Sequence, residues 1–215
     1  MRIAVIGASG WLGGAVAREA LARGHEVTGI VRDPGRLADA PEIVAVKADA
    51  TDPAAIGPAI AGHDVVVSSV TDRSTADRST IPKAVAALIE AVPAAGVPRL
   101  AVIGGGGSLH AENGERLVDQ PGFPEEYKAE AQAGAEALDL LLAAPPSLDW
   151  TFLSPPPANL TPGEKRGGYV VRDDDKPVTD ASGESAISSG DLASALLDEL
   201  ERPQFSRRRF TAGYA

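Results

Sequence analysis

Three evenly spaced glycines near the start of the chain are the residues best suited to chemistry. Gly7, Gly10 and Gly13 lie between a short apolar run at residues 2–6 and a stretch with helical spacing at residues 15–23. Without a Cβ, a glycine permits a tight turn and lets a phosphate approach the backbone. The amides at the start of a helix then face the anion. The pattern predicts a phosphate or pyrophosphate cradle, with a ligand-free glycine turn as the alternative.

The elements that must position this cradle alternate along the chain. Strands are expected at residues 2–6, 26–31, 43–47, 64–69, 99–103, 148–153 and 208–212, and helices at 15–23, 53–61, 82–95, 125–142 and 189–201. This alternation predicts one α/β domain over residues 1–215, a doubly wound and mainly parallel sheet with helices on both faces. Ligands of such sheets bind beyond the carboxyl ends of the strands.

Arg32 follows the second expected strand, where a dinucleotide-binding fold contacts the adenosine ribose. An acidic residue there accepts from the 2′-hydroxyl of NAD, whereas an arginine suits the 2′-phosphate of NADP. We therefore expect NADP(H) to be preferred over NAD(H). A surface arginine paired with Asp33 is the alternative.

Further polar residues follow the fourth and fifth strands. Ser68, Ser69 and Val70 are expected to line the ribose and pyrophosphate, or to serve as ordinary turn residues. The four glycines at residues 104–107 are expected to leave open backbone where the nicotinamide should lie. His110 follows them and could relay protons, although an exposed loop histidine is an equal alternative. The acidic run at residues 173–175 indicates a solvated loop.

Composition bounds the class of protein. The 215 residues are 44% hydrophobic and carry a net charge of −10, which disfavours nucleic acid and anionic membranes as partners. The chain has no cysteine, so thiolate chemistry and cysteine metal sites are excluded, and no metal site is expected. No apolar run reaches membrane-spanning length, so a cytoplasmic protein is expected, either a monomer or a homodimer.

Motifs along nearly the whole chain resemble the atypical short-chain dehydrogenases, in particular NADH-flavin reductases and NAD(P)H-binding proteins of the NmrA-like type. The matching segments are Ile-Gly-Ala-Ser-Gly-Trp-Leu-Gly at residues 6–13, Ile-Val-Arg-Asp-Pro at 30–34, Gly-Gly-Gly-Gly-Ser-Leu at 104–109, Phe-Pro-Glu-Glu-Tyr-Lys at 123–128, Leu-Asp-Trp-Thr-Phe-Leu-Ser-Pro-Pro at 148–156, Ile-Ser-Ser-Gly-Asp-Leu-Ala at 187–193 and Arg-Phe-Thr-Ala-Gly-Tyr at 209–214. The resemblance implies a Rossmann-type fold, similar in architecture to biliverdin reductase B.

The resemblance also implies roles for single residues. Asp49 would hydrogen-bond the adenine amino group, although it could instead cap the next helix. Ser108 matches the active-site serine of the superfamily. The usual catalytic Tyr-x-x-x-Lys pair is incomplete, because Tyr127 is present but position 131 is alanine. The full set expected to line the cofactor is Gly7, Ser9, Gly10, Trp11, Leu12, Gly13, Arg32, Asp49, Ala50, Ser68, Ser69, Val70, Gly104, Ser154 and Pro155, with Ser108, His110 and Tyr127 as catalytic candidates.

The activity implied is hydride transfer from NADPH to a small-molecule acceptor, either a free flavin or a quinone-like compound. Such a transfer needs no strong protein acid, so the absent lysine is tolerable. The acceptor site is expected in the loops after the strands and in the segment 154–188. Two alternatives remain open: a non-catalytic NADP(H)-sensing regulator of the NmrA-like type, and a reductase or epimerase dedicated to one metabolite.

Overall fold

The computed structural model describes residues 1–71 and 78–215. Its main sheet contains eight strands: β1 (Arg2–Ile6), β2 (Glu26–Val31), β3 (Val44–Lys47), β4 (Val65–Ser68), β5 (Arg99–Ile103), β6 (Asp149–Ser154), β8 (Tyr169–Arg172) and β10 (Arg208–Tyr214). Their order is β3-β2-β1-β4-β5-β6-β10-β8. Strand β8 pairs antiparallel with β10, and the other pairings in this sheet are parallel.

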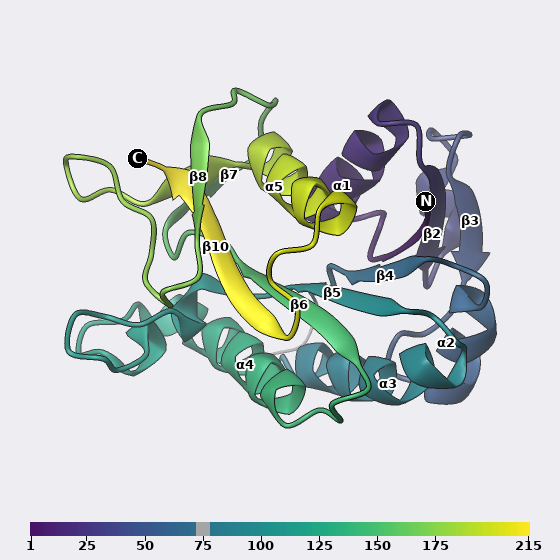
Figure 1. Ribbon diagram of the computed structural model, residues 1–215, viewed down its shortest axis with the longest axis horizontal. Coiled ribbons are helices and arrows are strands. Elements are labelled where there is room, and N and C mark those ends of the chain that lie inside the picture. Colours follow the sequence, from purple (N-terminus) through teal and green to yellow (C-terminus); the bar gives the residue numbers. More distant parts are fainter. Residues whose placement is uncertain (72–77) are drawn as a thin grey trace.

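Five α-helices flank the sheet: α1 (Trp11–Ala22), α2 (Pro53–Ile60), α3 (Thr80–Ala94), α4 (Glu125–Leu142) and α5 (Ser189–Glu201). Figure 1 shows α1 and α5 on one face and α2, α3 and α4 on the other. Each face has its own apolar core. Trp150, Phe152 and Phe210 are the largest fully buried side chains. Aliphatic residues fill most of the remaining interior. The predicted doubly wound α/β fold is confirmed.

The element boundaries differ from the predicted ones in informative places. Helix α1 begins at Trp11 and not at residue 15, because Gly10 is its N-cap and Gly13 and Gly14 lie inside the helix. Helix α4 has the predicted bounds. Asp33, Asp52 and Ser188 each cap the helix that follows, as their types suggest, by accepting a hydrogen bond from a backbone amide.

The segment after β6 contains strands that the sequence pattern did not indicate. Strands β7 (Asn159–Thr161) and β9 (Ala186–Ser188) form a separate two-stranded parallel sheet, and β8 is an edge strand of the main sheet. These strands have only three or four residues, and both Val170 and Val171 of β8 are exposed. Such short strands lack the alternation of apolar and polar residues on which prediction depends.

Candidate functional site

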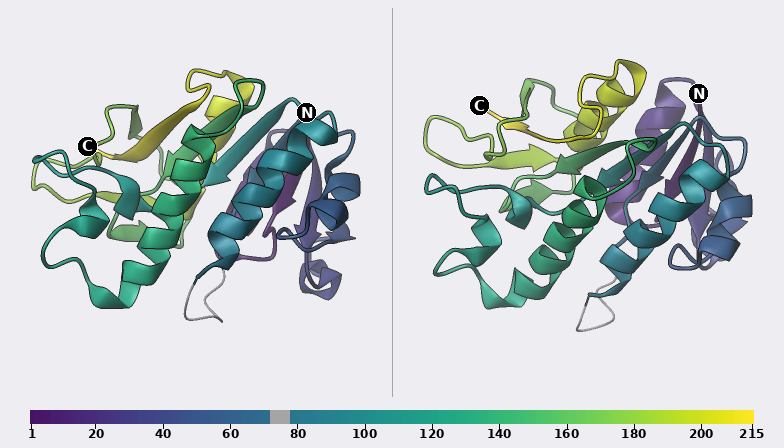
Figure 2. Two further views of the ribbon diagram at one scale, coloured as in Figure 1. Left: turned by 90° about the horizontal axis from the view of Figure 1, so that it is seen from below. Right: turned by 60° about the horizontal axis from the view of Figure 1, so that its bottom comes forward.

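The direction of chain connection reverses between β1 and β4, which are neighbours in the sheet. Ile6 at the end of β1 is in register with Ile30 of β2 and Ser68 of β4. The loops that follow these three strands therefore meet at one edge of the sheet, where ligands of doubly wound folds bind. The views in Figure 2 show the starts of α3 and α4 at this same edge.

Two of the three predicted glycines are required by close packing of the loop itself. A Cβ on Gly7, which has a φ of 81°, would lie 2.6 Å from the carbonyl oxygen of Ser69. A Cβ on Gly13 would overlap the Gly7 carbonyl group. These two positions hold the loop against β4 and against the start of α1.

Gly10 is less tightly packed than Gly7 and Gly13, because a Cβ there would have one close neighbour and would overlap nothing. That neighbour is the Gly7 carbonyl oxygen at 3.2 Å, which is a tight contact. Gly10 is exposed, and no side chain caps α1. The amides of Trp11, Leu12 and Gly13 in the first turn have no acceptor within the helix. This end of α1 fits a pyrophosphate, since the amides and the helix dipole both favour an anion there.

The other residues expected in this loop surround the same helix end. Ser9 and Leu12 are half-buried, and Trp11 is 43% exposed beside Gly10. On the β4 side, Ser68 and Ser69 are buried and Val70 is half-buried, and the Ser69 amide donates to the Ile6 carbonyl group.

Arg32 and Asp49 lie side by side, because β2 and β3 are paired up to Val31 and Lys47. Arg32 is exposed at the end of β2. The Asp49 carboxylate accepts from the Thr51 amide at 2.9 Å and from the Thr51 hydroxyl at 2.8 Å. These two hydrogen bonds, aided by the charge of Arg32, lower the pKa of Asp49. Ala50 follows, half-buried in the same turn.

Ser108 and Ser154, which lie far apart in the sequence, are brought together by the pairing of β5 with β6. Their hydroxyl oxygens are 3.3 Å apart, and both residues are fully buried. The Ser108 hydroxyl also donates to the Gly105 carbonyl group at 3.0 Å. Pro155 follows Ser154 and is buried. The two serines hold the loop after β5 against the end of β6.

The glycine run after β5 is packed, so the expectation of an open backbone there is wrong. A Cβ on Gly104 would overlap the ring of Phe152. A Cβ on Gly106 would lie 2.6 Å from the backbone of Pro155, and one on Gly107 would lie 2.6 Å from the Ala131 side chain. Only Gly105 of the four has no atom within 4 Å of its Cβ position among the described residues. The run is glycine-rich because α4 and the segment after β6 approach it closely.

Position 131, where the usual catalytic pair has its lysine, holds an alanine. Ala131 is buried and packs directly against Gly107. Tyr127 lies in the first turn of α4 with 57% of its surface exposed. Lys128 turns toward Glu125, with its ammonium nitrogen 3.6 Å from the carboxylate. The position one turn after Tyr127 on α4 is thus a buried alanine, and the neighbouring lysine faces a glutamate.

His110 is tied to a segment whose role the sequence did not indicate. Its amide donates to the Asp175 carbonyl group at 2.8 Å. The Asp175 carboxylate in turn accepts from buried Arg209, which also donates to the Ser108 carbonyl group. Asp175 is thus half-buried and structural, which corrects the expectation of a solvated acidic run at that residue.

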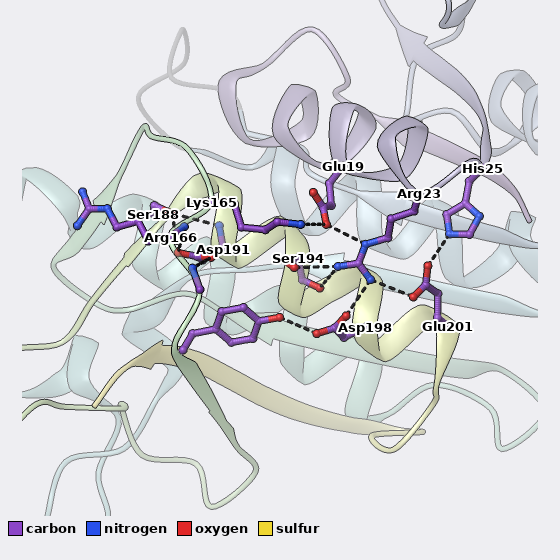
Figure 3. A network of polar contacts seen from close by, with 12 residues as sticks. Glu19, Arg23, His25, Lys165, Arg166, Ser188, Asp191, Ser194, Asp198 and Glu201 are labelled. Atoms are coloured by element: carbon purple, nitrogen blue, oxygen red, sulfur yellow. Dashed lines mark hydrogen bonds and ion pairs between the residues drawn. The ribbon is translucent and has the colours of Figure 1, made fainter.

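A polar network joins the C-terminal half of α1 to that of α5, away from the edge where both helices begin (Figure 3). Arg23 donates to Glu19, to Ser194 and Asp198, and to Glu201. Tyr169 donates to Asp198 at 2.6 Å, and burial together with this hydrogen bond raises the pKa of Tyr169 to about 12.

Asp191 is a fully buried acid that the sequence analysis did not single out. It occupies the fourth position of Ser188-Ser-Gly-Asp191, a spacing typical of a capping box at the start of a helix. That spacing is the sequence signal by which Asp191 could have been found. The Asp191 carboxylate accepts from the Arg166 and Gly167 amides, each at 2.9 Å, and from the Tyr214 hydroxyl at 2.6 Å. A capping box uses this acid on its own helix, whereas here it binds another loop.

No helix among the described residues is long and apolar enough to span a bilayer. No cluster of three or more histidine or acidic side chains suited to a metal ion occurs in the same part of the chain.

Comparisons with known proteins agree with the geometry of this edge. A family model described as NAD(P)H-binding matches residues 7–203. The uncharacterized protein YwnB of Bacillus subtilis strain 168 is 38% identical over 213 residues, which cover 98% of this chain and 97% of the relative. A crystal structure from Burkholderia pseudomallei, provisionally described as an exported protein, is 40% identical over all of both chains, with a TM-score of 0.89. A structure from Streptococcus pneumoniae TIGR4, provisionally described as an NADH-flavin reductase, is 35% identical over all of both chains, with a TM-score of 0.86.

Proposed function

The chain belongs to the NAD(P)H-binding family, and on that basis we propose that it is an NADPH-dependent oxidoreductase that reduces a free flavin or a quinone-like acceptor. The observation that carries the proposal is the packing of Ala131 against Gly107. A reaction at this site has no lysine-assisted tyrosine to deliver a proton. Flavin reduction is a hydride transfer that does not need one.

The chemistry balances without a protein acid. Bound NADPH supplies a hydride from nicotinamide C4, which carries two electrons to flavin N5, and water supplies the proton that flavin N1 takes up. The role left to the protein is to align the two rings and to exclude water from between them. The lighter packing at Gly10, beside the proposed pyrophosphate site, and the open Cβ position of Gly105, toward the proposed nicotinamide end, support such an arrangement.

The proposed roles of the chain's own groups follow from their positions. The first-turn amides of α1 bind the pyrophosphate, and Arg32 contacts the 2′-phosphate. Ser108 and Ser154 keep the loop after β5 in place. Because the Ser108 hydroxyl is fully buried, Ser108→Ala should lower the rate only modestly, through lost positioning.

The test is NADPH oxidation followed at 340 nm with and without FMN or riboflavin. The protein should be colourless when purified, since flavin is proposed as a substrate that leaves. Protein that arrives yellow with tightly held flavin would contradict the substrate role. Protein that binds NADPH but oxidises it no faster with any flavin or quinone would favour the NADP(H)-sensing alternative.

A further inference from the structure

The loop of residues 162–168, which joins β7 to β8, is anchored on the first turn of α5. The Gly163 amide donates to the Ser189 hydroxyl at 3.2 Å, and the Gly190 amide donates to the Gly163 carbonyl group at 3.0 Å. A Cβ on Gly190 would lie 2.6 Å from the backbone nitrogen of Lys165. The loop and the helix therefore fit only because position 190 has no side chain.

Asp191 provides the strongest hold on this loop. It is fully buried, and it accepts from the two loop amides of Arg166 and Gly167 as well as from the hydroxyls of Ser188 and Tyr214. A buried carboxylate with four donors fixes the backbone on which it closes. The backbone of Arg166 is thus held in one place.

The two cations of this loop point in different directions (Figure 3). The Lys165 ammonium group lies 2.9 Å from the Glu19 carboxylate and faces α1. Arg166 extends away from α1, with its guanidinium carbon 5.9 Å from the centre of the Tyr214 ring. Among the described residues no carboxylate forms an ion pair with Arg166, although the chain carries 30 acidic residues. A guanidinium on an aromatic face keeps its planar fork available for an anion.

Topology puts Arg166 at the edge where the candidate site lies. Helices α1 and α5 run in the same direction, because Arg23 at the end of α1 contacts Asp198 and Glu201 near the end of α5. Both helices therefore begin at the carboxyl edge of the sheet, and the loop on the first turn of α5 lies there too.

The distance from the loop 162–168 to the proposed nicotinamide end can be estimated along β10. The Thr211 hydroxyl of β10 donates to the Ser154 carbonyl group at 2.7 Å. Tyr214 lies three residues further along β10, which is roughly 10 Å at about 3.3 Å per residue. A flat ring bound beside Ser154 would need a chain of about that length to bring an anionic group to Arg166.

We propose that Arg166 binds the anionic group of the acceptor, so that the acceptor is a phosphorylated flavin such as FMN in preference to riboflavin. This inference rests on the proposed flavin reductase function. Asp191 acts through Arg166 as a positioning residue. A charge-assisted contact to a phosphate accounts for the preference, because riboflavin has the same ring and the same sugar-like chain without the charge.

The experiment compares Arg166→Gln with Arg202→Gln, a matched variant that removes the same charge from the far end of α5, where Arg202 is exposed. Steady-state kinetics with FMN and riboflavin are measured together with calorimetric binding of each flavin to protein loaded with NADP⁺. Arg166→Gln should raise KM and Kd for FMN roughly tenfold, the size of one charge-assisted contact, and leave those for riboflavin unchanged. Arg202→Gln should behave as wild type, and kcat and NADPH binding should be unchanged in both variants.

Equal affinity of the wild type for FMN and riboflavin would overturn the role of Arg166 but leave the reductase function intact. So would an equal FMN defect in Arg202→Gln, which would indicate a general effect of charge. Failure to reduce either flavin would overturn both the function and this inference.

Discussion

At the scale of single residues, Gly10 and Gly13 separate ligand binding from folding. A Cβ on Gly10 meets only the Gly7 carbonyl oxygen at 3.2 Å, whereas one on Gly13 overlaps that carbonyl group. Gly10→Ala should lose less unfolding free energy than Gly13→Ala and bind NADPH at least tenfold more weakly, because the methyl group enters the pyrophosphate site. Gly13→Ala should lose about 1–3 kcal/mol of unfolding free energy. Thermal denaturation and calorimetric titration would measure both; a Gly10→Ala protein with wild-type NADPH affinity would place the ligand elsewhere.

Arg32 is expected to determine the preference of the protein for NADPH over NADH. Arg32→Ala should weaken NADPH binding by roughly 1.5–3 kcal/mol, the range for a hydrogen bond to a charged group. NADH is the internal control, because it has no 2′-phosphate and should bind both proteins alike. Equal affinities of the wild type for the two dinucleotides would refute the preference.

Tyr127 should not act as an activated phenol, since Ala131 lies where a lysine would be needed and Tyr127 is mainly exposed. Tyr127→Phe should therefore reduce the rate of flavin reduction less than tenfold under saturating NADPH. A thousandfold loss would instead reveal an acid–base role and restore the usual mechanism of the superfamily.

At the scale of elements, Asp191 should link stability to acid pH. Burial alone would raise the pKa of Asp191, but hydrogen bonds from Tyr214, the Gly167 and Arg166 amides and Ser188 outweigh it and lower the pKa. A lowered pKa in the folded state gives stability that is present above the unfolded value near 3.9 and is lost as pH falls through the folded value.

Asp191→Asn should accordingly be about 2 kcal/mol less stable than wild type at pH 7, and the gap should narrow below about pH 4. Urea denaturation across this pH range would measure it, with exposed Asp39→Asn as the control. A gap that stays constant down to pH 2 would show that the charge of Asp191 does not matter.

How far the elements could be predicted depends on whether their signal is local. The glycine turn between β1 and α1 and the bounds of α4 follow from neighbouring residues, and the structure has both where the sequence pattern places them. Strands β7 to β9 are too short for a periodic pattern. The packing of Gly104 on Phe152 joins residues distant in the sequence, so the glycine run was wrongly expected to be open.

The candidate site likewise contains residues that a local sequence signal identifies and residues that only tertiary contacts bring together. Gly7, Gly10 and Gly13 could be identified from their spacing, whereas the contact of Ser108 with Ser154 depends on the pairing of β5 with β6. Asp191 and Arg166 could not be paired from the sequence, because their contact depends on where the loop 162–168 folds back. Residues joined by tertiary contacts without a local motif need the structure.

At the scale of the whole molecule, one small domain should hold the dinucleotide firmly and the flavin loosely. The most direct measurement is an anaerobic reaction of equimolar NADPH and FMN with catalytic protein, recording NADPH loss at 340 nm and flavin bleaching at 450 nm together. The wild type should accelerate both signals, with one NADPH consumed per flavin reduced, and Gly10→Ala should fall close to the uncatalysed rate at the same NADPH concentration. Wild-type protein that binds NADPH yet leaves both signals at the uncatalysed rate would contradict this prediction.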